Sequence, residues 1–270
     1  MKTKKTASAA KQKKTPKMNI RKPETIRTDK TYPINEIIKQ CICDNHDGKM
    51  AGMLSISTSI VWNASCTAKR KINTLVCSKC YSAALNDQRK GLDIKTKVNH
   101  LILNYRRYKV SEMPTLNALM FRFEAFADLS SDIQAWNYLA LVLHNPLVNF
   151  GLWTKNPWHL YNAIMKYNNG KKPKNLQVLY SSPVINQCCA NALKMYILPG
   201  SVPMIDKVFT VYTAEFAIEH GIKIQCGNSV CIECKTCYFK NRVKLVNEVI
   251  KTEQKKYYKL LAAKQKSGKK

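Results

Sequence analysis

Val148-Asn-Phe-Gly-Leu-Trp-Thr154 and Leu176-Gln-Val-Leu-Tyr-Ser181 are two short apolar runs, and a helical pattern lies between them from Pro157 to Gly170. Short runs rich in β-branched and aromatic residues are typical of strands, and proline suits the first turn of a helix. A strand, a helix and a second strand in this order predict two parallel strands joined by a crossover helix.

The same alternation extends from this unit in both directions. We expect further strands at residues 53–61, 119–123, 208–212 and 222–225, and helices at 83–109 and 130–145, the latter capped by Ser130 or Ser131. A lysine-rich pattern over residues 238–263 predicts a long amphipathic helix. The predicted fold class is therefore α/β, either a partial (β/α) barrel or a mainly parallel sheet with flanking helices.

Positive charge is concentrated at the two ends of the chain. The whole chain carries a net charge of +28, of which residues 1–30 carry +9 and residues 251–270 carry +7. The first 30 residues lack apolar periodicity and predict a disordered basic arm. We expect an α/β domain over residues 31–237 and a basic helix with its tail over 238–270. Such tails either bind the phosphates of nucleic acids or only confer solubility.

The cysteine content suggests metal binding in a reducing compartment. The chain has 11 cysteines and no apolar stretch near the roughly 20 residues that span a bilayer. Its basic start also lacks the apolar core of a secretory signal. We therefore expect a cytoplasmic protein without a membrane partner, in which clustered cysteines bind metal before they form disulfides.

The stronger cysteine motif lies near the C-terminus. Its spacing is C-x4-C-x2-C-x2-C, formed by Cys226, Cys231, Cys234 and Cys237. Four thiolates complete the tetrahedral shell of Zn²⁺ or bind the four irons of a [4Fe–4S] cluster. The crowding of the motif resembles ferredoxin-type binding more than a zinc ribbon. We predict a metal site here, of structural or electron-transfer character.

A second motif, C-x10-C-x2-C, follows the first long strand pattern and consists of Cys66, Cys77 and Cys80. Three thiolates on a [4Fe–4S] cluster would leave one iron open to a ligand such as S-adenosylmethionine. Alternatively, a fourth ligand closes the site, and Cys41, Cys43, His46 and His100 are candidates. Whether Cys41 and Cys43 bind metal stays open, and the adjacent pair Cys188 and Cys189 is more typical of packing.

Polar side chains follow the predicted strands, where the functional residues of parallel α/β folds gather. Glu124, Asp128 and Lys155 are candidate catalytic residues, and Arg122, Ser181 and Ser182 are candidate cofactor-binding residues. A rim salt bridge or a helix N-cap contact is the alternative role of Glu124 and Asp128, and Lys155 could instead be a solvated lysine. If the fold is as predicted, both cysteine groups share one rim with them.

Several of these segments together resemble a family of cysteine-rich bacteriophage and bacterial proteins named after phage gene product eighty-eight. The likeness covers most of residues 53–240 and rests on short segments: Cys77-Ser-Lys-Cys80-Tyr81, Asn104-Tyr-Arg-Arg107, Arg122 to Asp128, Phe150-Gly-Leu-Trp-Thr-Lys155, Leu179-Tyr-Ser-Ser182 and the terminal four cysteines. The family usually has Gly-Asp where this chain has Ala127-Asp128. The resemblance implies a phage origin and this organisation, but no activity.

The layout is also similar to that of radical S-adenosylmethionine enzymes, which have three cysteines after the first strand and often an auxiliary C-terminal site. The chain departs from that pattern in its ten-residue cysteine gap, since C-x3-C-x2-C is usual, and it lacks a Gly-Gly-Glu segment after the second strand. The leading hypothesis is a phage-type iron–sulfur enzyme that modifies a nucleic acid or protein. The alternative is a non-catalytic Zn²⁺ protein that binds nucleic acid through its basic tails.

Overall fold

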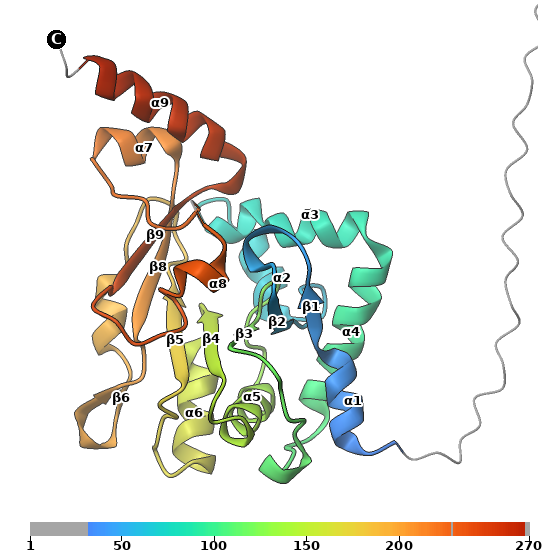
Figure 1. Ribbon diagram of the computed structural model, residues 1–270. Coiled ribbons are helices and arrows are strands. Elements are labelled where there is room, and N and C mark those ends of the chain that lie inside the picture. Colours follow the sequence, from blue (N-terminus) through green and yellow to red (C-terminus); the bar gives the residue numbers. More distant parts are fainter. Residues whose placement is uncertain (1–31, 228, 268–270) are drawn as a thin grey trace, which may run out of the picture. The chain divides into compact units, whose positions relative to one another are not determined.

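The computed structural model describes residues 32–227 and 229–267, and Figure 1 shows its helices and strands. All of the described elements belong to one unit, Pro33–Lys270. The basic arm predicted for residues 1–30 lies outside the described residues, as does the very end of the basic tail.

A seven-stranded sheet organises this part of the chain, and its order is β1-β2-β3-β4-β5-β8-β9. The first strand pairs antiparallel with the second, and all the later pairs are parallel. The strands are β1 (Cys43–Asn45), β2 (Met53–Ile56), β3 (Met120–Phe123), β4 (Asn149–Thr154), β5 (Leu176–Ser181), β8 (Lys207–Tyr212) and β9 (Leu245–Val249). The mainly parallel sheet that the sequence predicts is confirmed.

The parallel strands follow one another in chain order, as they do in a (β/α) barrel, but the sheet stays open between β1 and β9. Parallel crossovers are nearly always right-handed, so a sheet that grows in one direction collects its connecting helices on one face. The helices between strands are α2 (Ala64–Arg70), α3 (Tyr81–Gln88), α4 (Lys90–Tyr105), α5 (Asp132–His144), α6 (Pro157–Tyr167) and α7 (Ala214–Glu219), and α1 (Ile34–Cys41) precedes them all.

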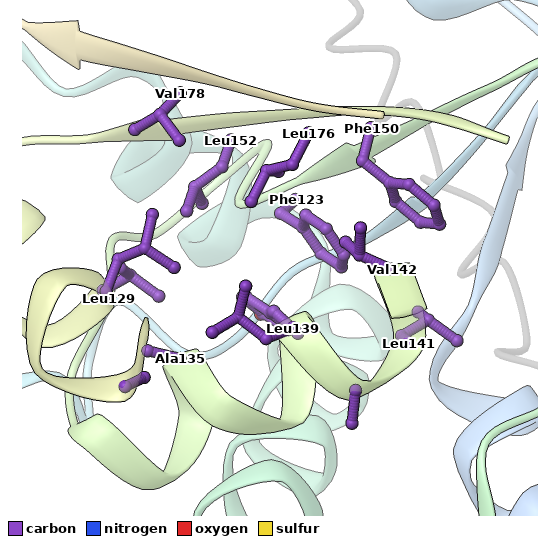
Figure 2. Close-up of a cluster of buried hydrophobic side chains, with 14 of the residues drawn as sticks. Phe123, Leu129, Ala135, Leu139, Leu141, Val142, Phe150, Leu152, Leu176 and Val178 are labelled. Atoms are coloured by element: carbon purple, nitrogen blue, oxygen red, sulfur yellow. The ribbon is translucent and has the colours of Figure 1, made fainter. Parts of the chain in front are cut away.

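The main core lies between the sheet and these helices. Figure 2 shows strand side chains such as Phe123, Phe150 and Leu152 directed toward Leu139 and Val142 of α5. Each of these side chains is at most 1% exposed, and such burial contributes roughly 1.5–3 kcal/mol per residue. This apolar face, drawn from residues at every second strand position, fixes the register of the sheet.

The opposite face of the sheet has a different cover, which comes from the four-cysteine segment. Tyr238 is buried there against Met53 and Met120, and α8 (Cys231–Cys234) packs beside it. A Cβ atom at Gly151 of β4 would lie 2.9 Å from the Tyr238 ring, so glycine allows the segment to approach the strands. The second cysteine group is thus part of the packing of the sheet.

A third hydrophobic cluster lies at the β8–β9 side of the sheet. Tyr212 and Val249, at the ends of β8 and β9, pack with Ala214 and Ala217 of α7 and with Tyr257 of α9 (Gln254–Ser267). The remaining short elements are the ribbon β6 (Ile197–Leu198) with β7 (Val202–Pro203), and the 3-10 turns η1 (Gly48–Met50), η2 (Val76–Lys79), η3 (Val110–Glu112), η4 (Ala190–Lys194), η5 (Pro199–Ser201) and η6 (Lys251–Glu253).

Most predicted elements are confirmed, including the cap of α5, where the Ser131 hydroxyl accepts a hydrogen bond from the Gln134 amide at 3.0 Å. The helix predicted over 238–263 is wrong for its first half, because Leu245–Val249 forms β9. Val246 and Val249 are each 1% exposed and pair with β8, so burial against a neighbouring strand outweighs the lysine-rich helical pattern.

Two further boundaries differ from the prediction. Residues 222–225 are not a strand, because Gln225 and Cys226 donate their amides to the Asn247 carbonyl while Ile222 and Ile224 pack near α7. The helix predicted at 83–109 is divided at Arg89, whose backbone (φ −121°, ψ 85°) is not helical. Local backbone geometry decides both differences, and the pattern of apolar residues does not reveal it.

Candidate metal centres

The first cysteine group lies at the carboxyl edge of the parallel strands. Cys66 is in the first turn of α2, where its amide donates to the Asn63 side chain at 3.2 Å. The Asn63 amide group donates in turn to the carbonyl of Asp128, which follows β3, at 2.7 Å. The loop after β2 is thereby fastened to the loop after β3.

Cys77 and Cys80 reach the same edge by a longer path. Cys77 is in η2 and Cys80 directly precedes α3. The turn is held at the end of β5, because the Val76 amide donates to the Pro183 carbonyl at 2.8 Å. The ten-residue gap between Cys66 and Cys77 is therefore the length of chain that crosses from the end of β2 to the end of β5.

Electrostatic coupling shows that these thiols lie near charged groups of the edge. The pKa of the Cys66 thiol is raised to about 12, first by burial and then by the carboxylates of Asp128 and Glu124, while the Lys155 ammonium lowers it. Burial also raises the pKa of Cys77, against the opposing effect of Lys155 and Lys69. At neutral pH these thiols keep their protons unless a metal replaces them.

Two lysines at this edge have ammonium groups that form no hydrogen bond to the described residues. The Lys69 nitrogen is buried, one helical turn after Cys66, and the Lys155 side chain is half-buried at the end of β4. An unpaired buried cation is costly unless a negative group lies beside it. Thiolates that carry a metal would supply that negative charge.

Asp128 fixes the position of Lys155. Its carboxylate is 5% exposed and accepts hydrogen bonds from the Thr154 hydroxyl at 2.5 Å and from the Lys155 amide at 3.0 Å. Both oxygen atoms are thus engaged by the strand end. These bonds hold the backbone of Lys155 at the edge.

Glu124 lies deeper than the sequence suggests. Its carboxylate is buried and accepts hydrogen bonds from the hydroxyl and amide of Thr58, from Gln134 and from the Tyr138 hydroxyl. Burial raises its pKa to about 7, although the bonds from Tyr138 and Thr58 lower it. Its backbone φ of +53° turns the chain at the end of β3. These contacts leave no oxygen atom free for a ligand.

Ser181 ends β5, and the hydroxyl of Ser182, the residue after it, is engaged within the protein. The Ser182 hydroxyl lies 3.1 Å from the Thr210 hydroxyl and accepts the Cys189 amide at 3.2 Å, and both serines are buried. Ser182 therefore joins β5 to β8. The ammonium group of Lys155 differs from the side chains of Glu124, Asp128 and Ser182 in that it forms no hydrogen bond to the described residues.

The second cysteine group lies over the second face of the sheet, so the expectation that both groups occupy one rim is wrong. All four cysteines line one cavity of about 40 Å³. Cys226 extends the edge of β9, through a bridge to Glu248, and Cys231 and Cys234 bound α8. Cys237 is half-buried beside the others, and partial burial of its thiol raises its pKa far above the usual range.

Two cations accompany this second group. The Arg122 guanidinium stacks 4.2 Å from the centre of the Trp153 ring, and its Nε atom has no hydrogen-bond partner in residues 32–227 and 229–267. Burial alone would lower its pKa, but nearby Tyr238, Tyr81, Cys231 and Cys237 raise it. Arg122 thus lies on the same face of the sheet as Tyr238, near the thiols of Cys231 and Cys237.

The second cation is Lys49, from the turn between β1 and β2. Its ammonium group lies 3.6 Å from the Cys226 sulfur and forms an ion pair with Glu248. Sequence reasoning missed Lys49 and Lys69. Lys69 carries a local signal, since it lies three residues after Cys66 on one helix, but nothing in the sequence connects Lys49 with Cys226.

The donor chemistry fits thiolate-bound metal at both groups, because each places several cysteines near two cationic side chains. No three His, Cys, Asp or Glu side chains of the described residues are yet arranged so that they could hold one ion. Metal binding would therefore require the thiols to turn toward a common centre. Such adjustment is usual where metal binding and local folding are coupled.

The other cysteines differ from these seven. Cys41 is 1% exposed in the main core, and burial raises its pKa to about 12. Its sulfur donates to the Ile37 carbonyl, so it serves as a small packing residue of α1. Cys43 follows in β1, and Cys188 and Cys189 lie before η4 near β8 and β5.

Comparison with protein-family models, with curated proteins and with solved structures gives no match to this chain. Among the helices of the described residues, none has the length and apolar character needed to span a membrane.

Proposed function

We propose that this chain is an iron–sulfur enzyme of the radical S-adenosylmethionine type, with two metal centres of different roles. Cys66, Cys77 and Cys80 would hold a [4Fe–4S] cluster with one open iron. Cys226, Cys231, Cys234 and Cys237 would hold a second centre. The observation that carries the proposal is the placement of three cysteines beside two unpaired lysines at the carboxyl edge of a parallel sheet.

The edge suits chemistry for a general reason. Loops after parallel strands are free to vary while the strands stay rigid, so ligands of such folds bind there. Here, the loops after β2, β3 and β4 are joined by the bonds from Asn63 to Asp128 and from Asp128 to Thr154. The loop that carries Cys66 is therefore held in a fixed position relative to the loops after β3 and β4.

A cluster bound by three cysteines would supply an electron and an open iron to a bound sulfonium cofactor. The chain's own residues would prepare the site. Lys155 and Lys69 would balance the thiolate charge, and Lys155 would also be free to bind a carboxylate of the cofactor. Asp128 would hold Lys155 in place, and Glu124 would keep the end of β3 turned toward α5.

The second centre would have a structural or electron-transfer role. It packs against Met53, Met120 and Tyr238 on a face of the sheet. Arg122 and Lys49 would offset the charge of four thiolates. The cytoplasmic location, the phage origin and the modification of a nucleic acid or protein stay parts of this proposal.

One observation favours the alternative, a zinc protein. A cavity of about 40 Å³ has room for roughly three water molecules, and this is closer to a single ion than to an eight-atom cluster. Zn²⁺ with four cysteines is a common structural site. The alternative applies to the second group and leaves the three-cysteine group unexplained.

Metal analysis of anaerobically purified protein tests the proposal. We expect brown protein that contains iron and acid-labile sulfide, and a loss of about one cluster's iron in Cys77→Ser. That variant should also lose binding of S-adenosylmethionine, measured by calorimetry, whereas Cys234→Ser should retain it. Colourless protein that contains zinc alone would contradict the enzyme and support the alternative.

A further inference from the structure

The carboxyl edge carries three exposed aromatic side chains around the first cysteine group. Trp62 is 46% exposed in the loop after β2, Tyr81 is 45% exposed at the start of α3, and Trp158 is 55% exposed at the start of α6. Single exposed aromatic residues are common on protein surfaces, whereas several of them around one group of loops suggest a binding surface. Two of the four tryptophans of the chain are placed here.

The hydrogen bonds of the edge connect the loops that carry these rings. Trp62 precedes Asn63, which is bonded to the Asp128 carbonyl, and Asn156, two residues before Trp158, donates to the Leu129 carbonyl at 3.2 Å. The Tyr81 hydroxyl donates to the Ala125 carbonyl at 3.2 Å. All three rings are therefore anchored to the one loop that follows β3.

Positive charge surrounds the rings. The segment 57–80 crosses from β2 to β5 over this edge and has four basic residues and no acidic one: Lys69, Arg70, Lys71 and Lys79. In addition, the Lys251 ammonium lies 5.0 Å from the centre of the Tyr81 ring, and the Lys97 ammonium lies 5.7 Å from that of Trp62.

The carboxylates of the same edge are already engaged. Glu124 and Asp128 are buried, Asp132 is bonded to His159 and Lys166, Glu215 pairs with Lys256, and Glu253 accepts the Ala214 amide. The net charge that the edge presents to solvent is therefore positive. Its ligand should be an anion that also offers flat apolar faces.

We infer that this carboxyl edge binds single-stranded nucleic acid, whose bases stack on Trp62, Tyr81 and Trp158 and whose phosphates pair with the lysines and arginine of segment 57–80. Base stacking on aromatic rings beside a basic groove is the usual means of binding single strands, and a duplex hides its base faces. The inference rests on the proposed function, since it names single-stranded nucleic acid as the substrate class of the proposed enzyme and places the strand at the three-cysteine site.

This edge differs from the basic tails in what it recognises. Tails made of lysine bind any polyanion through charge alone, and their contribution falls steeply as salt rises. Stacking contributes without charge, so binding at the edge should persist at salt concentrations that remove the tail contribution. Measuring affinity at low and at high salt therefore distinguishes the contribution of the edge from that of the tails in the intact chain.

Fluorescence anisotropy with a labelled oligo(dT) strand of about 16 nucleotides tests the inference at raised salt. Trp62→Ala should weaken binding by about 5-fold to 150-fold, and Trp158→Ala by a comparable factor, because each stacked base contributes about 1–3 kcal/mol. The matched control is Tyr105→Ala, an 80% exposed aromatic at the far end of α4, which should bind as the wild type does.

Further variants and probes identify the ligand and control for misfolding of the alanine variants. Trp62→Phe keeps an aromatic face and should restore most of the affinity, so a deficit that persists in this variant contradicts stacking. Lys71→Ala should lower the salt slope by about 0.7. Oligo(U) in place of oligo(dT) shows which sugar is preferred, and either preference supports the site.

Several results would overturn the inference: a duplex that binds as tightly as the single strand, equal losses in Trp62→Ala and Tyr105→Ala, or binding that disappears with salt in all variants. The proposed function fails separately. The Cys77→Ser variant should lose iron at the first cysteine group but keep its affinity for the strand. If the wild-type protein contains no iron and still binds the strand, the proposed enzyme is contradicted and the proposed binding site is not.

Discussion

The two cysteine groups hold the same side chains in different surroundings. The first group is carried by loops at the end of the strands, where the ammonium groups of Lys69 and Lys155 have no hydrogen-bond partner among the described residues and three aromatic rings face solvent. The second group covers a face of the sheet, where Tyr238 and Met120 are almost completely buried. The difference teaches that cysteine spacing alone does not separate a site for chemistry from one for packing, because neighbouring burial and unpaired charge decide it.

The largest expected effect tests whether the second group is structural. Tyr238→Ala should lower the free energy of unfolding by about 3–5 kcal/mol, because it removes a ring that is 2% exposed against Trp153 and Gly151. Urea denaturation measures this. Tyr81→Ala, at the edge of the first group, is the matched control and should cost about 1 kcal/mol or less.

A conservative change at the same position sharpens the comparison. The Tyr238 hydroxyl is buried without a hydrogen-bond partner in the described part of the chain, so Tyr238→Phe should leave stability unchanged or raise it slightly. If Tyr238→Ala and Tyr81→Ala destabilise the protein equally, the proposed division between a packed and an exposed group is wrong.

Metal removal should affect stability chiefly through the second group. If a metal binds there at a hundred times its Kd, its removal by a chelator should lower the free energy of unfolding by about 3 kcal/mol. The thermal midpoint of wild type and of Cys77→Ser should therefore fall on chelation, while that of Cys237→Ser should already be low and change little. A reversed order would assign the structural role to the first group.

The third effect is a pH dependence of stability that arises from Glu124, a buried residue near the first cysteine group. The folded pKa of Glu124, about 7, is above the ordinary value of 4.5 because the carboxyl group is buried. The folded state therefore binds this proton more tightly than the unfolded state does. Its contribution to stability is complete below pH 4.5 and is lost as pH rises through 7, by about 3 kcal/mol at most.

Glu124→Gln removes this titration and keeps the shape of the side chain. The difference in unfolding free energy between wild type and Glu124→Gln should therefore change with pH between 4.5 and 7 and be constant above it. Denaturation at a series of pH values measures the difference. A difference that stays flat over that range would mean that Glu124 is ionised throughout and that its four hydrogen bonds outweigh its burial.

The smallest effect tests the bond that places Lys155. Thr154→Val removes the hydroxyl that donates to Asp128 and accepts the Asn156 amide, at nearly unchanged volume, and should cost about 2 kcal/mol. Thr154→Ser retains the hydroxyl and is the control. Iron retention at the first group should fall in Thr154→Val and not in Thr154→Ser, while the second group keeps its metal in both.

Much of the fold could be predicted from local patterns. The runs at β4 and β5, the Ser131 cap and the Pro157 start of α6 each follow from a few neighbouring residues, and the structure confirms them. The prediction failed at β9, where Leu245–Val249 lies inside a lysine-rich pattern. Pairing with β8 decides that segment, and pairing between distant segments leaves no local periodicity.

The candidate sites divide in the same way. The sequence by itself determined which cysteines cluster, that polar residues follow the strands, and that the chain is strongly basic, because these depend on residue identity and spacing. Only the tertiary structure decided that Glu124 and Ser182 are committed to the interior, that Lys155 is not, and that Arg122 and Lys49 face the second group. Burial and pairing involve residues far apart in the chain, so they arise only when the chain is folded.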